Sequence, residues 1–329
     1  MSALASALQG FFSEHLQNRR RASPHTIAAY RDSWRMLLRF ASEQLAKEPS
    51  QLDLSDLDAP MIAAFLDHIE RERRCSIRSR NARLAAIRAL YRYAALDHPE
   101  HAATIERVLA IPAKRHERTL VTFLEDRELE ALLAAPDLTS RVGRRDRAMI
   151  LLGAESGLRA SELTALRWAD LELGRGAHVR CLGKGRKHRV TPLGAQCTAV
   201  LITWQREQGV DPAAPVFASN RGSAISRGGF ARRLALHGER AGELCPSLGS
   251  KRITPHVLRH TAAMRLLRAG VDVSVIALWL GHEQIETTQV YLHADLALKE
   301  QALARTTPPG VEPGRYRAPD ELLAFLDGL

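Results

Sequence analysis

The chain has 329 residues, and its 47 Lys and Arg residues outnumber its 37 Asp and Glu residues to give a formal net charge of +10. This length allows two domains of ordinary size. No apolar run approaches the roughly 20 residues that span a bilayer, and the first ten residues carry no secretory pattern, so we expect a cytoplasmic protein. A basic chain of this kind favours a polyanionic partner, most commonly nucleic acid.

The positive charge is shared evenly along the chain. Residues 1–120 hold 19 Lys and Arg against 14 Asp and Glu, and the remainder holds 28 against 23, so each part is +5. This favours contact of both halves with one long anion, although genomic base composition would explain the arginine content equally. The cysteines lack the CxxC spacing of zinc sites and are expected to be reduced thiols: Cys75, Cys181, Cys197 and Cys245.

The first third of the chain is predicted to be helical. Ser23-Pro24 places a cap before a proline at the first helical position, and a second helix is predicted after Ala59-Pro60. A third is predicted over 79–96. With the residue before it, this third helix carries a row of arginines: Arg78, Arg80, Arg83, Arg88 and Arg92. Such a row is either a solvated face, the commoner case, or a phosphate-binding surface, for which Arg80, Arg83 and Arg88 are candidates.

The apolar pattern stops over 111–120, which is therefore the predicted linker. After it the patterns predict helices and one β-hairpin, whose strands cover 178–182 and 189–193 and whose tip is basic. The expected helices cover 126–135, 145–168 with an interruption at 156–157, 195–208, 227–242, a segment opening at Thr254-Pro255, and 319–326. The expected fold class is thus mainly α with a small β-hairpin, in two domains.

Two polar patterns precede and include the hairpin. Arg159 and Glu162 are three residues apart in a helical segment, and this spacing makes them neighbours; an ordinary surface ion pair has the same pattern. At the hairpin tip lie Lys184, Arg186 and Lys187. A basic turn is either solvated or enters a DNA groove, where a lysine on a stiff hairpin can donate a proton to a leaving oxygen.

Two further patterns lie near the C-terminus. His256 and Arg259 share one face near a helix N-terminus, a place that favours anions, although such a pair is more often structural. Zinc binding by His256 and His260 is disfavoured because no Glu follows the first histidine. His282 and Tyr291 would face opposite ways on one helix, so a helix break between them is needed to bring them together.

Taken in order, these patterns resemble the signature of the tyrosine recombinases, the phage-integrase and Xer family. The segments that carry the resemblance read GLRASEL, GKGRKHRVTPL, HVLRH and LGHEQIETTQVY. The N-terminal helices resemble the SAM-like core-binding domain of that family. The resemblance implies a core-binding domain over 1–110, a linker over 111–120, a catalytic domain over 121–308 and a C-terminal tail over 309–329.

The resemblance also implies a reaction that needs no metal or cofactor. Tyr291 would attack a DNA phosphate to form a 3′-phosphotyrosyl link, with His256 as the proton acceptor. Arg159, Arg259 and His282 would hold the non-bridging oxygens, and Lys184 would protonate the departing 5′-oxygen. Glu162 would orient these groups without touching the phosphate.

The expected partner is double-stranded DNA, bound as a homo-tetramer on two sites, with the need for a second recombinase left open. The apolar tail segment 322–326 would dock either on its own domain or on a neighbour. The alternatives are a type IB topoisomerase, which shares the chemistry, and a DNA-binding protein that has lost catalysis. The sequence does not specify the target site, nor whether the task is chromosome dimer resolution or mobile-element or plasmid recombination.

Overall fold

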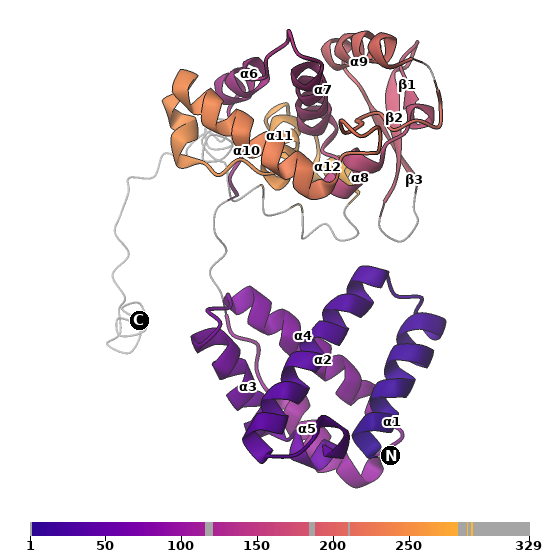
Figure 1. Ribbon diagram of the computed structural model, residues 1–329, viewed down its shortest axis with the longest axis vertical. Coiled ribbons are helices and arrows are strands. Elements are labelled where there is room, and N and C mark those ends of the chain that lie inside the picture. Colours follow the sequence, from indigo (N-terminus) through magenta and orange to yellow (C-terminus); the bar gives the residue numbers. More distant parts are fainter. Residues whose placement is uncertain are drawn as a thin grey trace, which may run out of the picture. The chain divides into compact units, whose positions relative to one another are not determined.

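The computed structural model describes residues 2–115, 121–183, 188–209 and 211–281, together with Thr288 and Tyr291 (Figure 1). The chain divides into two compact units, Met1–Arg118 and Thr119–Leu329, and each is described by itself. Within the described residues, no helix is both long and apolar enough to cross a membrane.

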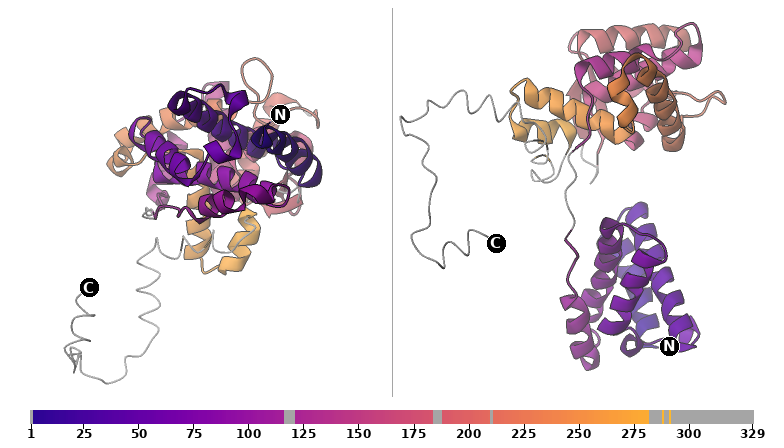
Figure 2. Two further views of the ribbon diagram at one scale, coloured as in Figure 1. Left: turned by 90° about the horizontal axis from the view of Figure 1, so that it is seen from below. Right: turned by 90° about the vertical axis from the view of Figure 1, so that its left-hand side faces the viewer.

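The first unit is a bundle of helices, and its described residues contain no strand (Figures 1 and 2). Its α-helices are α1 (Ala3–Gly10), α2 (Pro24–Leu45), α3 (Ala59–Arg71), α4 (Ile77–Ala94) and α5 (Ala102–Ala110). A π-helical stretch covers Phe11–Arg19, and short 3-10 turns cover Pro49–Gln51, Leu54–Asp56 and Pro99–His101.

The predicted start at Ser23-Pro24 is confirmed by its cap, whereas α4 begins at Ile77, two residues before its predicted start, with Ser76 as its cap. The Ser23 side chain accepts a hydrogen bond from the backbone N–H of Thr26, with Pro24 at the first helical position of α2. The apolar stripe of α2 buries Trp34 and Leu37. Tyr91 of α4 is also buried in this core, and its hydroxyl donates to the carbonyl of Leu57 over 2.6 Å.

The arginine row of α4 differs in part from its prediction, because both interpretations assumed exposed side chains and only Arg78 and Arg92 are exposed. Arg80 is only 5% exposed, and its Nε lies 3.6 Å from Glu70 Oε2. Arg83 is half-buried and donates to the carbonyl of Ser79. Arg88, also half-buried, donates to the carbonyl of Ile111. Direct phosphate binding by Arg80 is therefore corrected, since its guanidinium is enclosed within the unit.

The first residues of the predicted linker pack on α4 instead of standing free. Asn81 Oδ1 accepts a hydrogen bond from the backbone N–H of Lys114, and Asn81 Nδ2 donates to the Lys114 carbonyl. Lys114 Nζ also lies 2.7 Å from Glu70 Oε2. Residues 116–120 of the predicted linker lie outside the described residues.

The second unit combines helices with one small sheet. Its α-helices are α6 (Asp126–Ala134), α7 (Arg141–Ser156), α8 (Ala160–Ala165), α9 (Ala195–Gln208), α10 (Arg227–Leu244), α11 (Pro255–Arg268) and α12 (Val273–Leu280). The strands are β1 (Leu171–Glu172), β2 (His178–Leu182) and β3 (His188–Pro192), with 3-10 turns at Trp168–Asp170 and Pro246–Ser250. The predicted fold class, mainly α with a small β-hairpin, is confirmed.

The sheet is antiparallel in the order β1-β2-β3. The predicted hairpin is confirmed, and its register sets Cys181 opposite Arg189. Because side chains alternate across a strand, Arg189 lies on the same face as the buried Thr191, while Val190 between them is exposed. The pattern missed β1, which is only two residues long.

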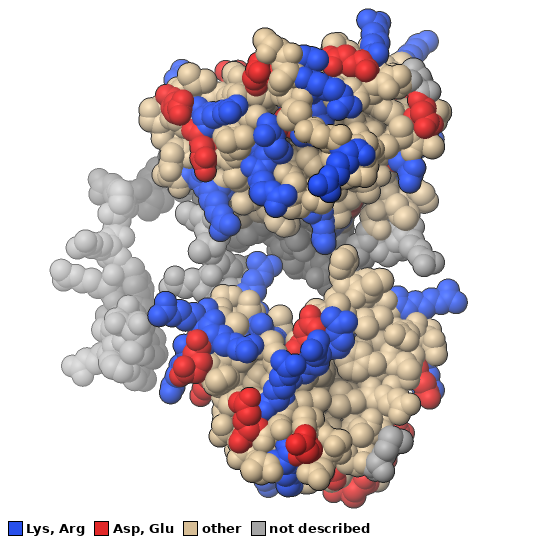
Figure 3. All heavy atoms as spheres, viewed as in Figure 1, with Lys and Arg blue, Asp and Glu red and all other residues tan. Residues whose placement is uncertain are grey.

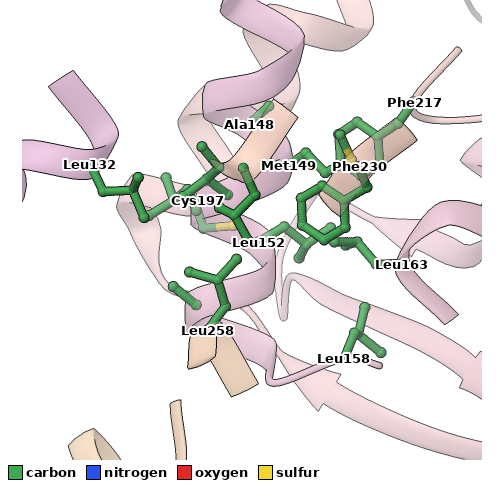
Figure 4. Packing of buried hydrophobic residues seen from close by; sticks show 14 of the residues in the cluster. Leu132, Ala148, Met149, Leu152, Leu158, Leu163, Cys197, Phe217, Phe230 and Leu258 are labelled. Atoms are coloured by element: carbon green, nitrogen blue, oxygen red, sulfur yellow. The ribbon is translucent and has the colours of Figure 1, made fainter. Parts of the chain in front are cut away.

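The core of this unit forms around α7 (Figure 4). The apolar side chains of α7, including Met149 and Leu152, are buried against residues of other elements such as Phe230 of α10 and Leu258 of α11. The helix ends at Gly157, whose φ of +64° suits glycine. A Cβ there would approach Leu280 Cδ2 to 2.5 Å, so the close contact of α7 with α12 also requires glycine.

Candidate active site

Arg159 occupies the position just before α8, and Glu162 follows in the first turn. Glu162 Oε2 accepts a hydrogen bond from the Arg159 backbone N–H over 2.8 Å, and Arg159 Nη1 donates to Glu162 Oε1 over 2.8 Å. The predicted contact is therefore present. The predicted geometry is corrected in one respect, because Arg159 has extended backbone angles and caps the helix instead of lying on its face.

Arg259 belongs to the second turn of α11 and is 5% exposed. Its Nη1 donates to the carbonyl of Gly157 over 2.6 Å, and its Nη2 donates to the carbonyl of Leu280 over 2.7 Å. Burial, together with the nearby charges of Arg159 and Arg189, lowers the pKa of Arg259 to about 10. The guanidinium remains charged at neutral pH and is held in one orientation.

Arg189 of β3 is a member of this site that the sequence patterns did not identify. Its Nη2 donates to Glu162 Oε2 over 2.9 Å, and its Nη1 donates to the carbonyl of Leu280 over 2.7 Å. The observed register sets Arg189 opposite the buried Cys181, so the alternation of β3 is the sequence signal that could have found it.

The three guanidinium groups converge on the C-terminal end of α12. Arg189 and Arg259 both donate to the Leu280 carbonyl, and Arg159 Nη2 donates to the Gly281 carbonyl over 2.9 Å. These carbonyls are the negative end of the helix dipole. Gly281 has a φ of +66°, and a Cβ there would lie 2.5 Å from Arg189 Nη1, so only glycine allows this approach.

One carboxylate balances this group of cations. Burial raises the pKa of Glu162, but the Arg159 backbone hydrogen bond and the charges of Arg189 and Arg159 outweigh it, and the net direction is downward. Among the described residues, these three guanidinium groups against the Glu162 carboxylate leave an excess of positive charge. An enclosed region with surplus cationic donors is suited to an anion such as a phosphodiester.

Tyr291 contacts α11, the helix that carries Arg259, through a hydrogen bond with His260. Its hydroxyl lies 3.0 Å from His260 Nδ1, and the two rings meet edge to face with centroids 5.6 Å apart. Tyr291 is 2% exposed and packs with apolar residues of α11 and α12, such as Met264 and Ile276. Burial raises the pKa of Tyr291, and the charge of Arg259 opposes that change.

His256, in the first turn of α11, is exposed, and its ring centroid lies 6.5 Å from that of His260. The spacing of His256 and His260 indicated only a disfavoured zinc pair, so the contact of His260 with Tyr291 was not predicted. Among the described residues, no group of three or more His, Cys, Asp or Glu side chains is arranged to hold a metal ion.

Several predicted residues lie outside the described residues: Lys184, Arg186, Lys187, His282 and the tail 309–329. The expected approach of Tyr291 to His282 is among these predictions. The described site thus consists of Arg159, Glu162, His256, Arg259 and Tyr291 from the predicted set, with Arg189 and His260 added.

Comparison with known proteins identifies the family. Residues 122–297, just over half of the chain, match the phage integrase family, and residues 9–98 match the phage integrase N-terminal SAM-like domain. The chain is similar to a Sinorhizobium fredii (strain NBRC 101917 / NGR234) protein named as an integrase/recombinase, y4rC. The two are 52% identical over 328 residues, which cover 100% of this chain and 99% of that protein.

Other similar proteins carry the names of recombinases and integrases as well. The tyrosine recombinase XerC of Xanthomonas campestris pv. campestris (strain B100) is 36% identical over 293 residues, covering 89% of this chain and 85% of that protein. The fold is similar to that of the XerH site-specific recombinase bound to its palindromic difH substrate, with a TM-score of 0.68, 23% identity and coverage of 87% and 81%. The Tn1549 transposon integrase in complex with transposon right end DNA gives a TM-score of 0.69, 16% identity and coverage of 93% and 99%.

The fold and the matched domains define a two-domain DNA strand-exchange enzyme. The chain belongs to the phage integrase family of tyrosine recombinases and acts in site-specific DNA recombination. The relatives do not favour the topoisomerase or the inactive DNA-binding protein as alternatives.

Proposed function

We propose that Tyr291 is the nucleophile that cleaves DNA and that it carries the 3′-phosphotyrosyl intermediate. The observation that carries this proposal is the position of the Tyr291 hydroxyl. It lies 3.0 Å from an imidazole on α11, the helix that also holds the buried Arg259 guanidinium. A phenol has a pKa near 10, so it needs a neighbouring base to act at neutral pH.

In the proposed step, the Tyr291 oxygen bonds to phosphorus while the bond from phosphorus to the 5′-oxygen breaks. The phenol proton goes to a histidine of α11, the role that the resemblance gives to His256. Lys184 supplies a proton to the departing 5′-oxygen, which becomes a hydroxyl. The 5′-hydroxyl of another strand then reverses the step, and no ATP is needed because the covalent link retains the energy of the broken bond.

The phosphate would be held by Arg159 and Arg259, together with His282. A guanidinium has five N–H donors, and the two described arginines place some of theirs on the carbonyls of Gly157, Leu280 and Gly281. The remaining donors can serve the non-bridging oxygens, where charge concentrates in the transition state. Glu162 would keep Arg159 oriented through its two hydrogen bonds.

The DNA contacts would come from both units. Lys and Arg side chains lie on the visible face of each unit, interspersed with fewer Asp and Glu side chains (Figure 3). Both units carry the same excess positive charge in the sequence. Arg83 and Arg88 of α4 and Arg186 and Lys187 of the hairpin stay candidate contacts to the DNA backbone. We place this activity in the cytoplasm, at the nucleoid, where the DNA is.

We propose that the active assembly is a homo-tetramer on two DNA sites. An apolar pocket of about 450 Å³ on the second unit supports this. It is lined by side chains of α7, α11 and α12, including Ala154, Leu266 and Trp279. The apolar tail segment 322–326 of a neighbouring copy is the proposed occupant. Truncation after residue 308 should leave binding of single sites intact and abolish pairing of two sites in a gel-shift assay.

Trapping on a nicked suicide substrate tests the nucleophile. The site is first found by selecting bound DNA from the genome of the source organism. The wild-type chain should give a protease-sensitive protein–DNA adduct, and Tyr291→Phe should give none while binding the site equally well. Tyr316→Phe, the same change at the tyrosine of the tail, is the matched control and should still form the adduct. An adduct with Tyr291→Phe would overturn the proposal.

A further inference from the structure

Arg189 anchors strand β3 to the candidate active site. Its side chain is only 9% exposed, and its guanidinium joins β3 to two elements that are 27 and 91 residues away in the chain. Nη2 donates to Glu162 Oε2 of α8 over 2.9 Å, and Nη1 donates to the Leu280 carbonyl at the end of α12 over 2.7 Å. A planar guanidinium with two such partners has both its position and its orientation fixed.

Stability alone does not explain an arginine at this position. The Arg189 Nε is buried and has no hydrogen-bond partner among the described residues, and an unpaired buried donor costs about 1–3 kcal/mol. Position 189 lies opposite the buried Cys181 in the hairpin, where an apolar side chain would also pack. Because well-packed apolar residues often replace a buried ion pair without loss of stability, the contacts of Arg189 point to a role in the reaction.

Glu162 connects Arg189 to Arg159, the arginine that is proposed to hold the phosphate. Glu162 Oε2 accepts hydrogen bonds from Arg189 Nη2 and from the Arg159 backbone N–H, and Oε1 accepts from Arg159 Nη1. The Glu162 side chain is 7% exposed, so salt screens these pairs little. The phosphate-binding arginine and the hairpin strand are therefore held by the same carboxylate.

The anchored strand also fixes the ends of the hairpin loop. Strand β2 ends at Leu182 and β3 begins at His188, and the register pairs these two residues. Lys184, the proposed proton donor to the departing 5′-oxygen, belongs to the segment between them and lies outside the described residues. Because a chain spans at most about 3.3–3.6 Å per residue, fixing the two strands restricts the space that the Lys184 side chain can reach.

We propose that Arg189 is a positioning residue for protonation of the leaving group. By holding β3 against Glu162 and the Leu280 carbonyl, it sets the hairpin where Lys184 reaches the 5′-oxygen. This inference rests on the proposed role of Lys184. The proton passes from the Lys184 ammonium to the 5′-oxygen as the bond from phosphorus to that oxygen breaks, and Arg189 itself transfers no proton. Loss of its contacts should therefore slow the departure of a leaving group only where that group needs a proton.

The test compares two suicide substrates that differ in one atom, the 5′-bridging oxygen or a sulfur in its place. Sulfur leaves as a thiolate without a proton donor, because a thiol has a pKa near 8.5. With the oxygen substrate, full-length Arg189→Lys should cleave about tenfold more slowly than wild type, the lower end for a residue that orients others. With the sulfur substrate, the variant and the wild type should cleave at the same rate.

Reference variants show what each kind of defect looks like. Lys184→Ala should lose about 10²- to 10⁴-fold with the oxygen substrate, as when a general acid is removed, and should recover with sulfur. Arg159→Lys, a change at the proposed phosphate contact, should be slow with both substrates. His188→Asn, a change at the exposed neighbour in β3, should match wild type with both. Adding Arg189→Lys to Lys184→Ala should cause no further loss with oxygen, because both changes act on one step.

Each outcome decides between a positioning role and another role. The inference is overturned if Arg189→Lys is equally slow with both substrates, or if its loss adds to that of Lys184→Ala. Recovery with sulfur also shows that the variant is folded and binds DNA. Where the lysine variant unfolds, Arg189→Gln, which keeps N–H donors without the planar fork, gives the same comparison. If Lys184→Ala does not recover with sulfur, the proposed proton donor itself is refuted, and this inference with it.

Discussion

Asp146 and Glu162 are two buried carboxylates of the second unit. Each binds several cationic side chains, but one cluster is structural and the other belongs to the candidate active site. Asp146 of α7 is contacted by Arg145, by Arg233 Nε at 2.5 Å and by His237 Nε2 at 2.8 Å. Every one of these contacts joins α7 to itself or to α10. His237 is fully buried, and no nucleophile lies among these groups. The Asp146 cluster therefore holds two helices together.

The Glu162 cluster differs in where its donors point. Arg159, Arg189 and Arg259 donate to the carbonyls at the end of α12, and Arg159 and Arg189 also bind Glu162. Arg259 acts electrostatically on Tyr291. Surplus cationic donors beside a reactive hydroxyl distinguish the site from the structural cluster. Burial and charge pairing alone do not, because both carboxylates have a lowered pKa.

Exchanging one arginine for lysine in each cluster should produce the largest difference in cleavage rate between the two clusters. Arg259→Lys keeps the charge but loses the fixed planar fork, so we expect cleavage to fall about 10²- to 10³-fold, as when a preorganised transition-state donor is removed. Arg145→Lys, the matched change in the Asp146 cluster, should lower the melting temperature and leave the cleavage rate of the folded enzyme unchanged. Equal losses of rate in both variants would remove the distinction between the clusters.

A substitution of Arg189 tests whether the contacts of the hairpin with Glu162 and the Leu280 carbonyl contribute to cleavage. Arg189→Lys cannot bind Glu162 and the Leu280 carbonyl with the same two-point geometry, so cleavage should fall about tenfold, the lower end for a residue that orients others. His188→Asn changes the exposed neighbour on the other face of β3 and should have no effect. The rates are compared at saturating DNA, and a wild-type rate for Arg189→Lys would make its contacts merely structural.

Asp146→Asn should affect stability and not chemistry. It removes the charge that compensates Arg145 and Arg233 in a buried place, and breaking a buried pair costs about 3–5 kcal/mol. Urea denaturation measures the free energy of unfolding, and suicide-substrate cleavage at low temperature measures the rate. A loss below about 1 kcal/mol, still large enough to resolve by such denaturation, would mean that the cluster contributes little to the fold.

The smallest expected effect is on the pH dependence of stability. The folded pKa of His260, about 4, lies below its ordinary value of 6.5, so the unfolded chain binds more protons between these values. Stability from this group is complete above pH 6.5 and is lost as the pH falls toward 4. The full shift corresponds to about 3 kcal/mol, which partial solvent access reduces to about 1–2 kcal/mol. His260→Asn should therefore lose less stability than wild type between pH 7 and 5, measured by thermal unfolding; an equal loss would contradict the shift.

The fold was predictable where local chemistry decides it. Ser23-Pro24 and Thr254-Pro255 each cap a helix as expected, and the alternation of β2 and β3 predicted their pairing. The prediction failed where a charged side chain turned inward. Arg80 was predicted to be exposed because arginine usually is, and Arg189 was not singled out. Only the tertiary partners Glu70 and Glu162 reveal that these two side chains turn inward.

The site was predictable through its motif but not through its geometry. The pairing of Arg159 with Glu162 followed from their spacing. The contact of His260 with Tyr291 spans 31 residues, and it depends on how the chain returns after α12, which no local periodicity encodes. Likewise, the meeting of three arginines at Leu280 and Gly281 combines α8, β3 and α11 with the end of α12.

The most direct test of the account is to identify the residue that carries the DNA. The adduct trapped on a suicide substrate is digested with nuclease and protease, and mass spectrometry locates the nucleotide on the peptide. The account predicts a nucleotide joined through its 3′-phosphate to Tyr291. A nucleotide on Tyr316 or on a serine, or one joined through a 5′-phosphate, would contradict it.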